Sequence, residues 1–102
     1  MKEFHKVAKL EQCPPGKVIC VWFEGKKVAI FNVDGTLYAT SDECTHIGGA
    51  LSDGWMKGTH VTCPLHGAIF DVTTGAILAQ PAAIPLTCYQ VRIEGDEIQL
   101  SS

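Results

Sequence analysis

The sequence of 102 residues predicts an all-β fold, a small sandwich or barrel framework of short antiparallel strands. Two observations lead to this prediction. Strand-like apolar runs end at turn dipeptides such as Asp34-Gly35, and no stretch keeps helical spacing over three turns with caps at both ends. Because 46% of the residues are apolar, one domain of this length can bury a core without relying on disulfide bonds.

The first expected strands lie in the N-terminal half of the chain. Glu24-Gly25 and Asp34-Gly35 are hairpin signals, and they separate three apolar runs at residues 18–23, 27–33 and 37–39. Three aromatic residues of the first two runs are more often core than site residues, so they are expected to be buried: Trp22, Phe23 and Phe31.

A second hairpin is expected near the C-terminus. Residues 86–93 and 98–100 are strand-like, and Glu94-Gly95-Asp96 lies between them as a turn. A short strand-like run, residues 60–62, lies in the middle of the chain.

The middle of the chain, approximately residues 42–82, is expected to be a loop-rich binding subdomain inserted in a single domain of residues 1–102. Six of the ten glycines fall within residues 42–80. Glycine lets the backbone approach a bound object closely. The segment therefore resembles a binding site grafted onto a β framework.

Two motifs in this segment carry the chemistry. The first motif is Cys44-Thr45-His46, and the second motif is Cys63-Pro64-Leu65-His66. Each offers one thiolate and one imidazole, the set needed by a [2Fe–2S] cluster that has two Cys on one iron and two His on the other. Two thiolates and two neutral imidazoles leave the oxidised core neutral, whereas four thiolates make it a dianion. The mixed set therefore raises the reduction potential to roughly −150 to +300 mV, whereas plant-type clusters with four Cys ligands have about −400 mV.

The alternative occupant is zinc, which Cys₂His₂ sets also hold in structural modules. The commoner zinc spacing pairs Cys with Cys and His with His, whereas each motif here mixes the two. Glycines also follow both motifs, at Gly48, Gly49 and Gly67, where backbone amides could point at bridging sulfides. The pattern favours the iron–sulfur cluster over a zinc-held interaction module.

At these residues the chain resembles the Rieske-type [2Fe–2S] proteins, and the resemblance covers roughly residues 17–100. It extends to Leu51-Ser52-Asp53-Gly54 after the first motif, and to Phe70-Asp71-Val72-Thr73-Thr74-Gly75 after the second. Gln80-Pro81-Ala82 and Pro85-Leu86 are similar to the proline-bearing loop that covers the cluster in this family.

The resemblance implies a Rieske-like fold with four cluster ligands. By that resemblance, Cys44 and Cys63 would hold the inner iron. His46 and His66 would hold the outer iron near the surface.

The chain departs from the Rieske subunits of respiratory and photosynthetic complexes at four positions. Those subunits carry an extra, disulfide-linked cysteine in each motif loop, and the matching residues here are Gly49 and Leu65. They also place a serine and a tyrosine hydroxyl near the cluster sulfurs, where this chain has Ala68 and Phe70. Hydroxyl donors raise the potential, so we expect a potential at the low end of the Rieske range.

The resemblance implies a soluble Rieske ferredoxin, a carrier rather than an enzyme. Such domains pass single electrons from an NAD(P)H-dependent flavoprotein reductase to the terminal oxygenase of an aromatic-ring-hydroxylating dioxygenase. That oxygenase needs a mononuclear iron site of two His and one carboxylate, and the leftover histidines here, His5 and His60, are far apart in sequence. The runner-up is the small subunit of an assimilatory nitrite reductase, although such subunits commonly lack some of the four ligands.

Composition limits the partners and the location. The formal net charge of −3 argues against nucleic acid as the main partner. No apolar run approaches the ~18–20 residues of a membrane span, and the N-terminus has no apolar signal region. We therefore expect a cytoplasmic monomer that docks around His46 and His66. The remaining cysteines are expected to be free thiols, with a Cys20–Cys88 disulfide left open: Cys13, Cys20 and Cys88.

Residues beside the motifs allow two interpretations each. Trp55-Met56 could contact a redox partner, but packing under the cluster loops is favoured. The acidic residues flanking the first motif either steer the encounter with basic partners or form a solvated rim: Asp42, Glu43 and Asp53. His5 and His60 are expected to be ordinary surface residues.

Overall fold

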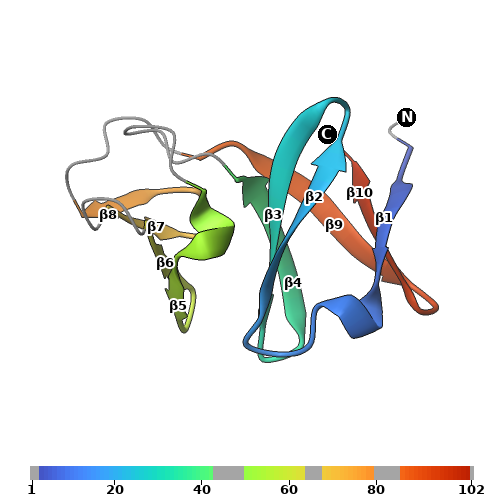
Figure 1. Cartoon of the computed structure of the whole chain (residues 1–102), viewed down its shortest axis with the longest axis horizontal. Helices are drawn as coiled ribbons and strands as arrows, with labels where there is room; N and C mark the ends of the chain where they lie inside the picture. Colours follow the sequence, from blue (N-terminus) through green and yellow to red (C-terminus); the bar gives the residue numbers. More distant parts are fainter. Residues whose placement is uncertain (1–2, 43–49, 64–67, 80–85, 102) are drawn as a thin grey trace.

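A computed structural model of the chain describes residues 3–42, 50–63, 68–79 and 86–101. It contains a six-stranded and a four-stranded sheet, both antiparallel, which lie side by side along the long axis (Figure 1). The predicted all-β antiparallel architecture is confirmed. The only helices among the described residues are two single 3₁₀ turns, η1 (Leu10–Gln12) and η2 (Leu51–Asp53).

The larger sheet has the strand order β1-β10-β9-β4-β3-β2 and includes both ends of the described chain. Its strands are β1 (His5–Lys9), β2 (Val18–Phe23), β3 (Lys26–Val33), β4 (Thr36–Ser41), β9 (Cys88–Glu94) and β10 (Glu97–Ser101).

Tight turns set the register of β2, β3 and β4, as the sequence predicted. Glu24 and Gly25 connect the paired residues Phe23 and Lys26, and both have positive φ, 52° and 78°. Asp34 and Gly35 repeat this pattern between β3 and β4, with φ of 52° and 96°. Positive φ at both central residues is the type I′ arrangement, whose twist matches that of the flanking strands.

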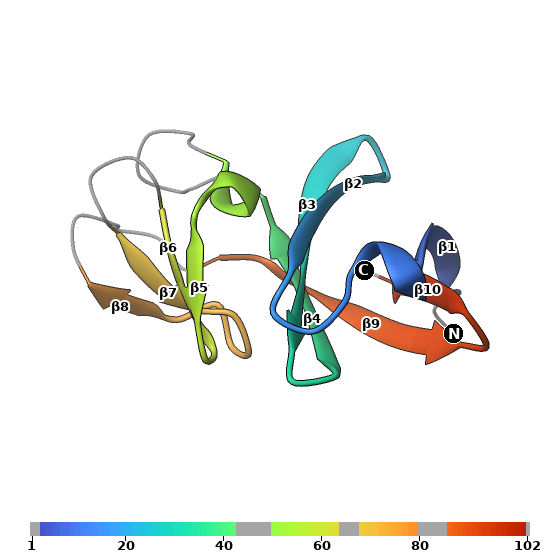
Figure 2. The same ribbon diagram turned by 60° about the horizontal axis from the view of Figure 1, so that its bottom comes forward.

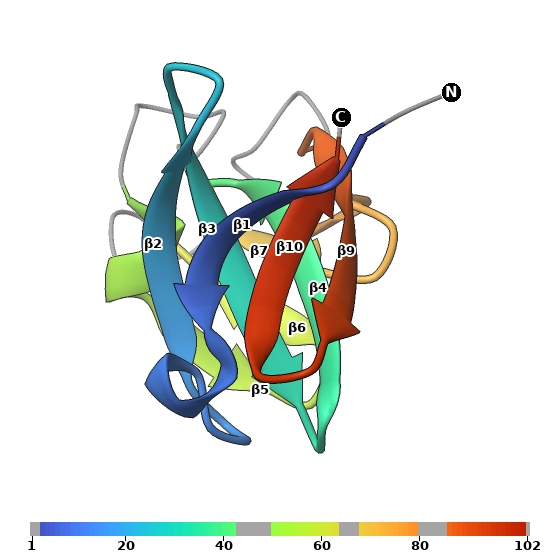
Figure 3. The same cartoon turned by 90° about the vertical axis from the view of Figure 1, so that its right-hand side faces the viewer.

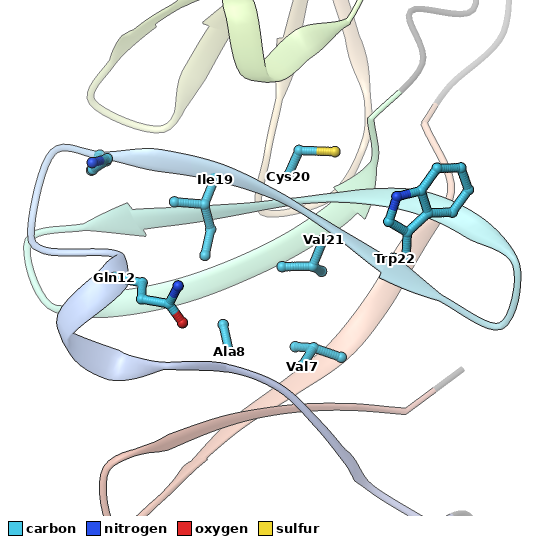
Figure 4. A pocket seen from close by; sticks show the side chains of 8 residues that line it. Val7, Ala8, Gln12, Ile19, Cys20, Val21 and Trp22 are labelled. Carbon is cyan, nitrogen blue, oxygen red and sulfur yellow. The ribbon is translucent and has the colours of Figure 1, made fainter.

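The six strands curl around a common axis, so that β1 and β2 face each other as the two unpaired edges of a nearly closed barrel (Figure 3). A groove of about 580 Å³ runs between these edges. Val7, Ala8, Ile19 and Val21 point into it, whereas Trp22 points away (Figure 4).

The open edges have features that discourage pairing with another chain. β1 has a register irregularity between Lys6 and Ala8. Exposed lysines flank the groove at Lys6, Lys9 and Lys17. Bulges and edge lysines are common protections against edge-to-edge association.

The smaller sheet has the strand order β5-β6-β7-β8 and follows η2 in the chain (Figure 2). Its strands are three residues long: β5 (Trp55–Lys57), β6 (His60–Thr62), β7 (Ile69–Asp71) and β8 (Ile77–Ala79). Strands this short do not stand alone, so the small sheet depends on packing against the barrel.

Two buried clusters hold the molecule together. The barrel core fills the inside of the larger sheet, and it consists of Ala8, Cys13, Phe23, Val28, Ile30, Leu37, Ala39, Ile98 and Leu100. The junction core joins the two sheets, and it consists of Ala29, Phe31, Leu51, Val61, Cys63, Ala68, Phe70, Val72 and Leu86. Ala29 and Phe31 of β3 belong to the junction core, whereas Val28 and Ile30 belong to the barrel core. Because successive side chains of β3 point to opposite faces, this one strand contributes to both cores.

Phe23 and Phe31 are buried as predicted, but the prediction for Trp22 was wrong. Its side chain is 66% exposed. Alternation along β2 directs the side chains of Val21 and Phe23 into the barrel core, which leaves the outer face to Trp22. The Lys27 ammonium, on the paired residue of β3, lies 5.6 Å from the centre of the exposed ring.

Sheet register also settles the spare cysteines. Cys20 pairs with Ala29, Ala29 with Thr40, and Thr40 with Cys88. Three strand spacings of about 4.8 Å separate the two thiols, well beyond the reach of a disulfide. Cys13, Cys20 and Cys88 are free thiols, as expected.

Candidate metal centre

Of the four predicted ligands, Cys63 lies within the described residues. Cys44, His46 and His66 lie outside them, as do Glu43, Gly49 and Leu65. Within the described ranges, no three His, Cys, Asp or Glu side chains gather in a way that could hold a metal ion.

The second motif occupies the connection between β6 and β7. The last β6 residue, Thr62, pairs with Ile69, and the backbone N–H of Cys63 donates to the carbonyl of Ala68 at 2.7 Å. This bond extends the ladder by one step beyond the strands. Cys63 is thus held at the point where the chain leaves β6 for the rest of the motif.

Cys63 is fully buried and packs with apolar side chains. Cys63, Ala68 and Phe70 have no exposed area, and all three belong to the junction core. Ala68 and Phe70 bring no hydroxyl to this region. A thiol shielded from solvent in this way fits an inner-iron ligand, and the chemistry of the two motifs fits the mixed ligation of a Rieske cluster.

The described residues on either side of the first motif, Asp42 before it and Leu51 and Ser52 after it, are hydrogen-bonded to each other. The segment that carries the motif follows Asp42 at the end of β4 and returns at Ala50, just before η2. The carbonyl of Asp42 accepts a hydrogen bond from the N–H of Leu51 at 2.7 Å. The Asp42 carboxylate accepts two more from Ser52, from the N–H to Oδ1 at 2.8 Å and from the hydroxyl to Oδ2 at 3.1 Å.

The burial of Asp42 corrects the prediction for the acidic residues of this region. Its side chain is only 2% exposed, so it is neither a solvated rim residue nor a steering charge. Asp53 is exposed, in agreement with both interpretations.

Gly54 brings the two motif regions together. A Cβ on Gly54 would collide with the carbonyl oxygen of Thr62, the residue before Cys63, and would press on the carbonyl of Leu51. The end of η2 and the end of β6 therefore approach each other as closely as a side-chain-free backbone allows.

Gly75 contacts Leu86, the first described residue after a third segment, 80–85; the residues of this segment lie outside the described ranges and include Gln80, Pro81, Ala82 and Pro85 of the predicted proline-bearing loop. The φ of Gly75 is +79°, and its carbonyl accepts a hydrogen bond from the N–H of Leu86 at 2.9 Å. A side chain at residue 75 would clash with the Leu86 carbonyl. Leu86 itself lies in the junction core, which thus contains residues at the ends of all three segments: Leu51, Cys63, Ala68 and Leu86.

The Trp55-Met56 pair on β5 divides between its two interpretations. Met56 is half-buried and packs against the junction core, as the favoured interpretation predicted. Trp55 is 65% exposed, so its ring is free to contact a partner. His5 and His60 are both exposed, as expected for surface residues.

Sequence reasoning missed the Asp42–Ser52 pair. The two residues are ten positions apart, and no turn or cap pattern connects such positions. It also missed Cys20 as a neighbour of this pair. Burial of the thiol within an otherwise exposed residue raises the pKa of Cys20, and the Asp42 carboxylate beside it raises that pKa further.

A comparison with known families decides the assignment. The Rieske [2Fe-2S] domain family matches residues 3–90. The chain belongs to the Rieske [2Fe-2S] family. The cofactor of this Rieske protein is accordingly a Rieske-type [2Fe–2S] cluster.

Curated relatives of this Rieske protein are ferredoxins, and the similarity covers nearly their whole length. It is 43% identical over 96 residues to a biphenyl dioxygenase ferredoxin subunit from Pseudomonas sp. (strain KKS102), covering 93% of this chain and 88% of the relative. It is 41% identical over 91 residues to the ferredoxin component of a naphthalene 1,2-dioxygenase system from Pseudomonas aeruginosa, covering 89% and 88%. Both relatives are named as ferredoxin parts of dioxygenase systems, and this chain is likewise an electron carrier and not an enzyme.

Solved structures agree with this assignment. The ferredoxin of Sphingomonas yanoikuyae B1 is 34% identical, with a TM-score of 0.91 over 98% of this chain and 99% of that one. A ferredoxin in a complex of reduced oxygenase and oxidized ferredoxin in carbazole 1,9a-dioxygenase is 32% identical, with a TM-score of 0.89 over 96% and 92%. A putative nitrite reductase small subunit matches at a TM-score of 0.80 over 96% and 97%, but at 24% identity this likeness shows the fold alone.

Among the described residues, no helix is long and apolar enough to cross a membrane.

Proposed function

We propose that this Rieske protein carries single electrons from an NAD(P)H-dependent flavoprotein reductase to a terminal aromatic-ring-hydroxylating oxygenase. Its similarity to dioxygenase ferredoxins over about nine-tenths of both chains carries this proposal. The ferredoxin–oxygenase complex of the carbazole system supports the second partner by analogy. The proposal includes one domain over residues 1–102, a cluster-binding subdomain at approximately 42–82, and a cytoplasmic monomer that needs neither nucleic acid nor membrane.

The proposed ligands are Cys44 and His46 of the first motif and Cys63 and His66 of the second. When bound, the cluster accepts and releases one electron at a time. The described residues supply the inner side of its site. Cys63 contributes a thiolate from a solvent-free position, and the backbone bond to Ala68 fixes where that residue stands.

The apolar wall formed by Ala68 and Phe70 favours a low potential. Neither residue offers a hydroxyl to a cluster sulfur, so the reduced, more negative state gains no stabilising donor from them. A carrier with a potential at the low end of the Rieske range is suited to receive electrons from a reduced flavin and pass them onward. It is poorly suited to oxidise a quinol.

Docking is proposed to occur around His46 and His66, with an interface small enough for rapid exchange of partners. The exposed ring of Trp55 on β5 is available to contact a partner. The substrate of the partner oxygenase does not contact the carrier, so it leaves no mark on this chain.

A reconstituted electron-transfer assay tests the proposal. The protein is mixed with an NADH-dependent ferredoxin reductase and the oxygenase of a naphthalene or biphenyl dioxygenase system, and product is measured per NADH consumed. Product formation is expected to require this chain, and the Cys63→Ser variant is expected to lose both the visible chromophore and the electron transfer. A retained chromophore in Cys63→Ser would remove that residue from the ligand set.

The same preparations separate the alternatives. Anaerobically purified protein is expected to contain iron and acid-labile sulfide and to give the Rieske electron paramagnetic resonance (EPR) signal after reduction with dithionite. Zinc without iron would instead identify a structural module. Electron delivery to a nitrite reductase but to no oxygenase would identify the small-subunit role.

A further inference from the structure

The Asp42–Ser52 pair has a role that ligand assignment alone does not explain. Asp42 is the last described residue before the segment with the first motif, and Ser52 lies in η2 just after it. We propose that Asp42 is a positioning residue for the cluster, whose buried carboxylate joins the start of this segment to its end and thereby fixes the reach of Cys44 and His46. This inference rests on the proposed function, since it needs those two residues to be ligands.

The first step of the argument concerns the connection itself. Three hydrogen bonds converge on Asp42 from two consecutive residues, one on its carbonyl from Leu51 and two on its carboxylate from Ser52. The carboxylate uses both oxygens on a single partner residue. This two-point attachment fixes the direction of η2 relative to β4 as well as their separation.

The second step concerns the anchorage of Asp42. Its own N–H donates to the carbonyl of Lys27 at 3.1 Å, which continues the β3–β4 ladder by one residue. η2 packs against β2 and β3 of the barrel. The position of the segment's base is therefore set by the rigid framework.

The third step concerns burial. At 2% exposure the carboxylate is shielded from water, so a lost hydrogen bond there is not replaced by solvent at no cost. No buried side-chain nitrogen or oxygen among the described residues lacks a hydrogen-bond partner, and the Asp42 carboxylate has Ser52 and the thiol of Cys20 beside it. The arrangement has the character of an outer-shell contact that holds a ligand-bearing segment in place.

Four proteins test the proposal: the wild type, Asp42→Ala, Asp42→Asn and Asp53→Asn. Alanine removes the carboxylate hydrogen bonds. Asparagine removes the charge but keeps an oxygen for the Ser52 N–H and gains an amide donor for the Ser52 hydroxyl. Asp53→Asn is the matched control, because it removes one negative charge from an exposed side chain of η2, the 3₁₀ turn that also contains Ser52.

The loaded proteins are compared by the rate at which a chelator bleaches the cluster and by the linewidth of the Rieske EPR signal. Asp42→Ala is expected to lose its cluster at least tenfold faster than the wild type, in line with about 10–100-fold effects of outer-shell contacts, and to broaden the signal. Asp42→Asn is expected to stay within about threefold of the wild type, and Asp53→Asn to match it. Equal effects of alanine and asparagine at residue 42, or a wild-type rate in Asp42→Ala, would overturn the proposal.

Ser52→Ala provides a second test if the Asp42→Ala protein cannot be purified with its cluster. It removes the hydroxyl donor but keeps the backbone donor, so faster cluster loss than in the wild type is expected and an unchanged rate would refute the role. The wild-type sample keeps this outcome separate from the proposed function. Its iron content and Rieske signal test the function, whereas the differences among variants test the positioning.

Discussion

Replacing Gly54 by alanine tests how closely the two motif regions are packed. The backbone at Gly54 has φ −89° and ψ −166°, a conformation open to any residue, so alanine carries no backbone penalty there. In open space the change would stabilise the fold by about 0.4–1 kcal/mol, because alanine restricts the unfolded chain. The structure predicts the opposite sign, since the added methyl group would collide with the Thr62 carbonyl oxygen and lie 3.2 Å from the Leu51 carbonyl oxygen.

The magnitude follows from the nature of the neighbours. Both are backbone atoms, which cannot move aside as a flexible side chain can, so overpacking of about 1–3 kcal/mol is expected. For a domain of this size 1 kcal/mol corresponds to roughly 4–8 °C in Tm, and the Gly54→Ala protein should melt about 5–15 °C below the wild type. Because Thr62 precedes Cys63, the cluster should also bleach faster in chelator.

The assay follows circular dichroism and visible absorbance together during anaerobic heating. Gly58→Ala is the control, because Gly58 lies in the β5–β6 turn with φ +59° and with no atom near its missing Cβ. That variant pays about 1–2 kcal/mol for a left-handed alanine but leaves Thr62 in place, so its Tm should fall without faster bleaching. A Gly54→Ala protein that melts at or above the wild-type temperature would refute the reasoning.

Two further predictions concern the junction and barrel cores. Phe70→Tyr is expected to raise the reduction potential by about 40 mV in a redox titration, because a hydroxyl donor that stabilises the reduced cluster by about 1 kcal/mol shifts a one-electron couple by that amount. The control is Phe31→Tyr, an equally buried change on β3, which should lower stability and leave the potential unchanged. An unchanged potential in both variants would contradict the prediction. Burial raises the pKa of the Cys13 thiol, so the folded state binds this proton more tightly than the unfolded chain. The resulting stabilisation is complete below the ordinary thiol pKa of 9.0 and is lost as the pH rises through the higher folded pKa. Urea midpoints measured between pH 8 and pH 11 should therefore fall less steeply in Cys13→Ala than in the wild type, and parallel curves would exclude this contribution.

Local signals predicted the barrel well. The run at residues 18–23 matches β2 (Val18–Phe23), and the Glu24-Gly25 and Asp34-Gly35 turns lie where the sequence indicated. These predictions succeeded because turn geometry depends on a few adjacent residues. The C-terminal strands were recognised with edges shifted by one or two residues, β9 beginning at Cys88 where residue 86 was expected.

The small sheet was harder to predict. Its strands have only three residues, too few to show alternation, and β6 alone was anticipated. β1 was missed because its residues are mostly exposed and two of its five residues are lysines. These segments become strands through pairing with distant partners, as β1 does with β10.

For the candidate site, the sequence indicated which residues to expect but not what supports them. Two thiol–imidazole motifs identified the cofactor class, because ligand chemistry is local and specific. The position of Cys63 beside Ala68 depends on strand register, and the burial of Asp42 depends on η2 packing against the barrel. The same limit explains the error at Trp22, whose exposure reflects which face of β2 the barrel core occupies.

The location of β1 and β10 has a practical consequence. Both strands lie at the end of the molecule away from the small sheet (Figure 1). A tether attached at this end of the molecule would therefore anchor the protein on an electrode, or to a fused reductase, with the small sheet facing outward. Immobilised in this way, the protein would keep the exposed Trp55 ring and the rest of the small sheet open to a partner in solution.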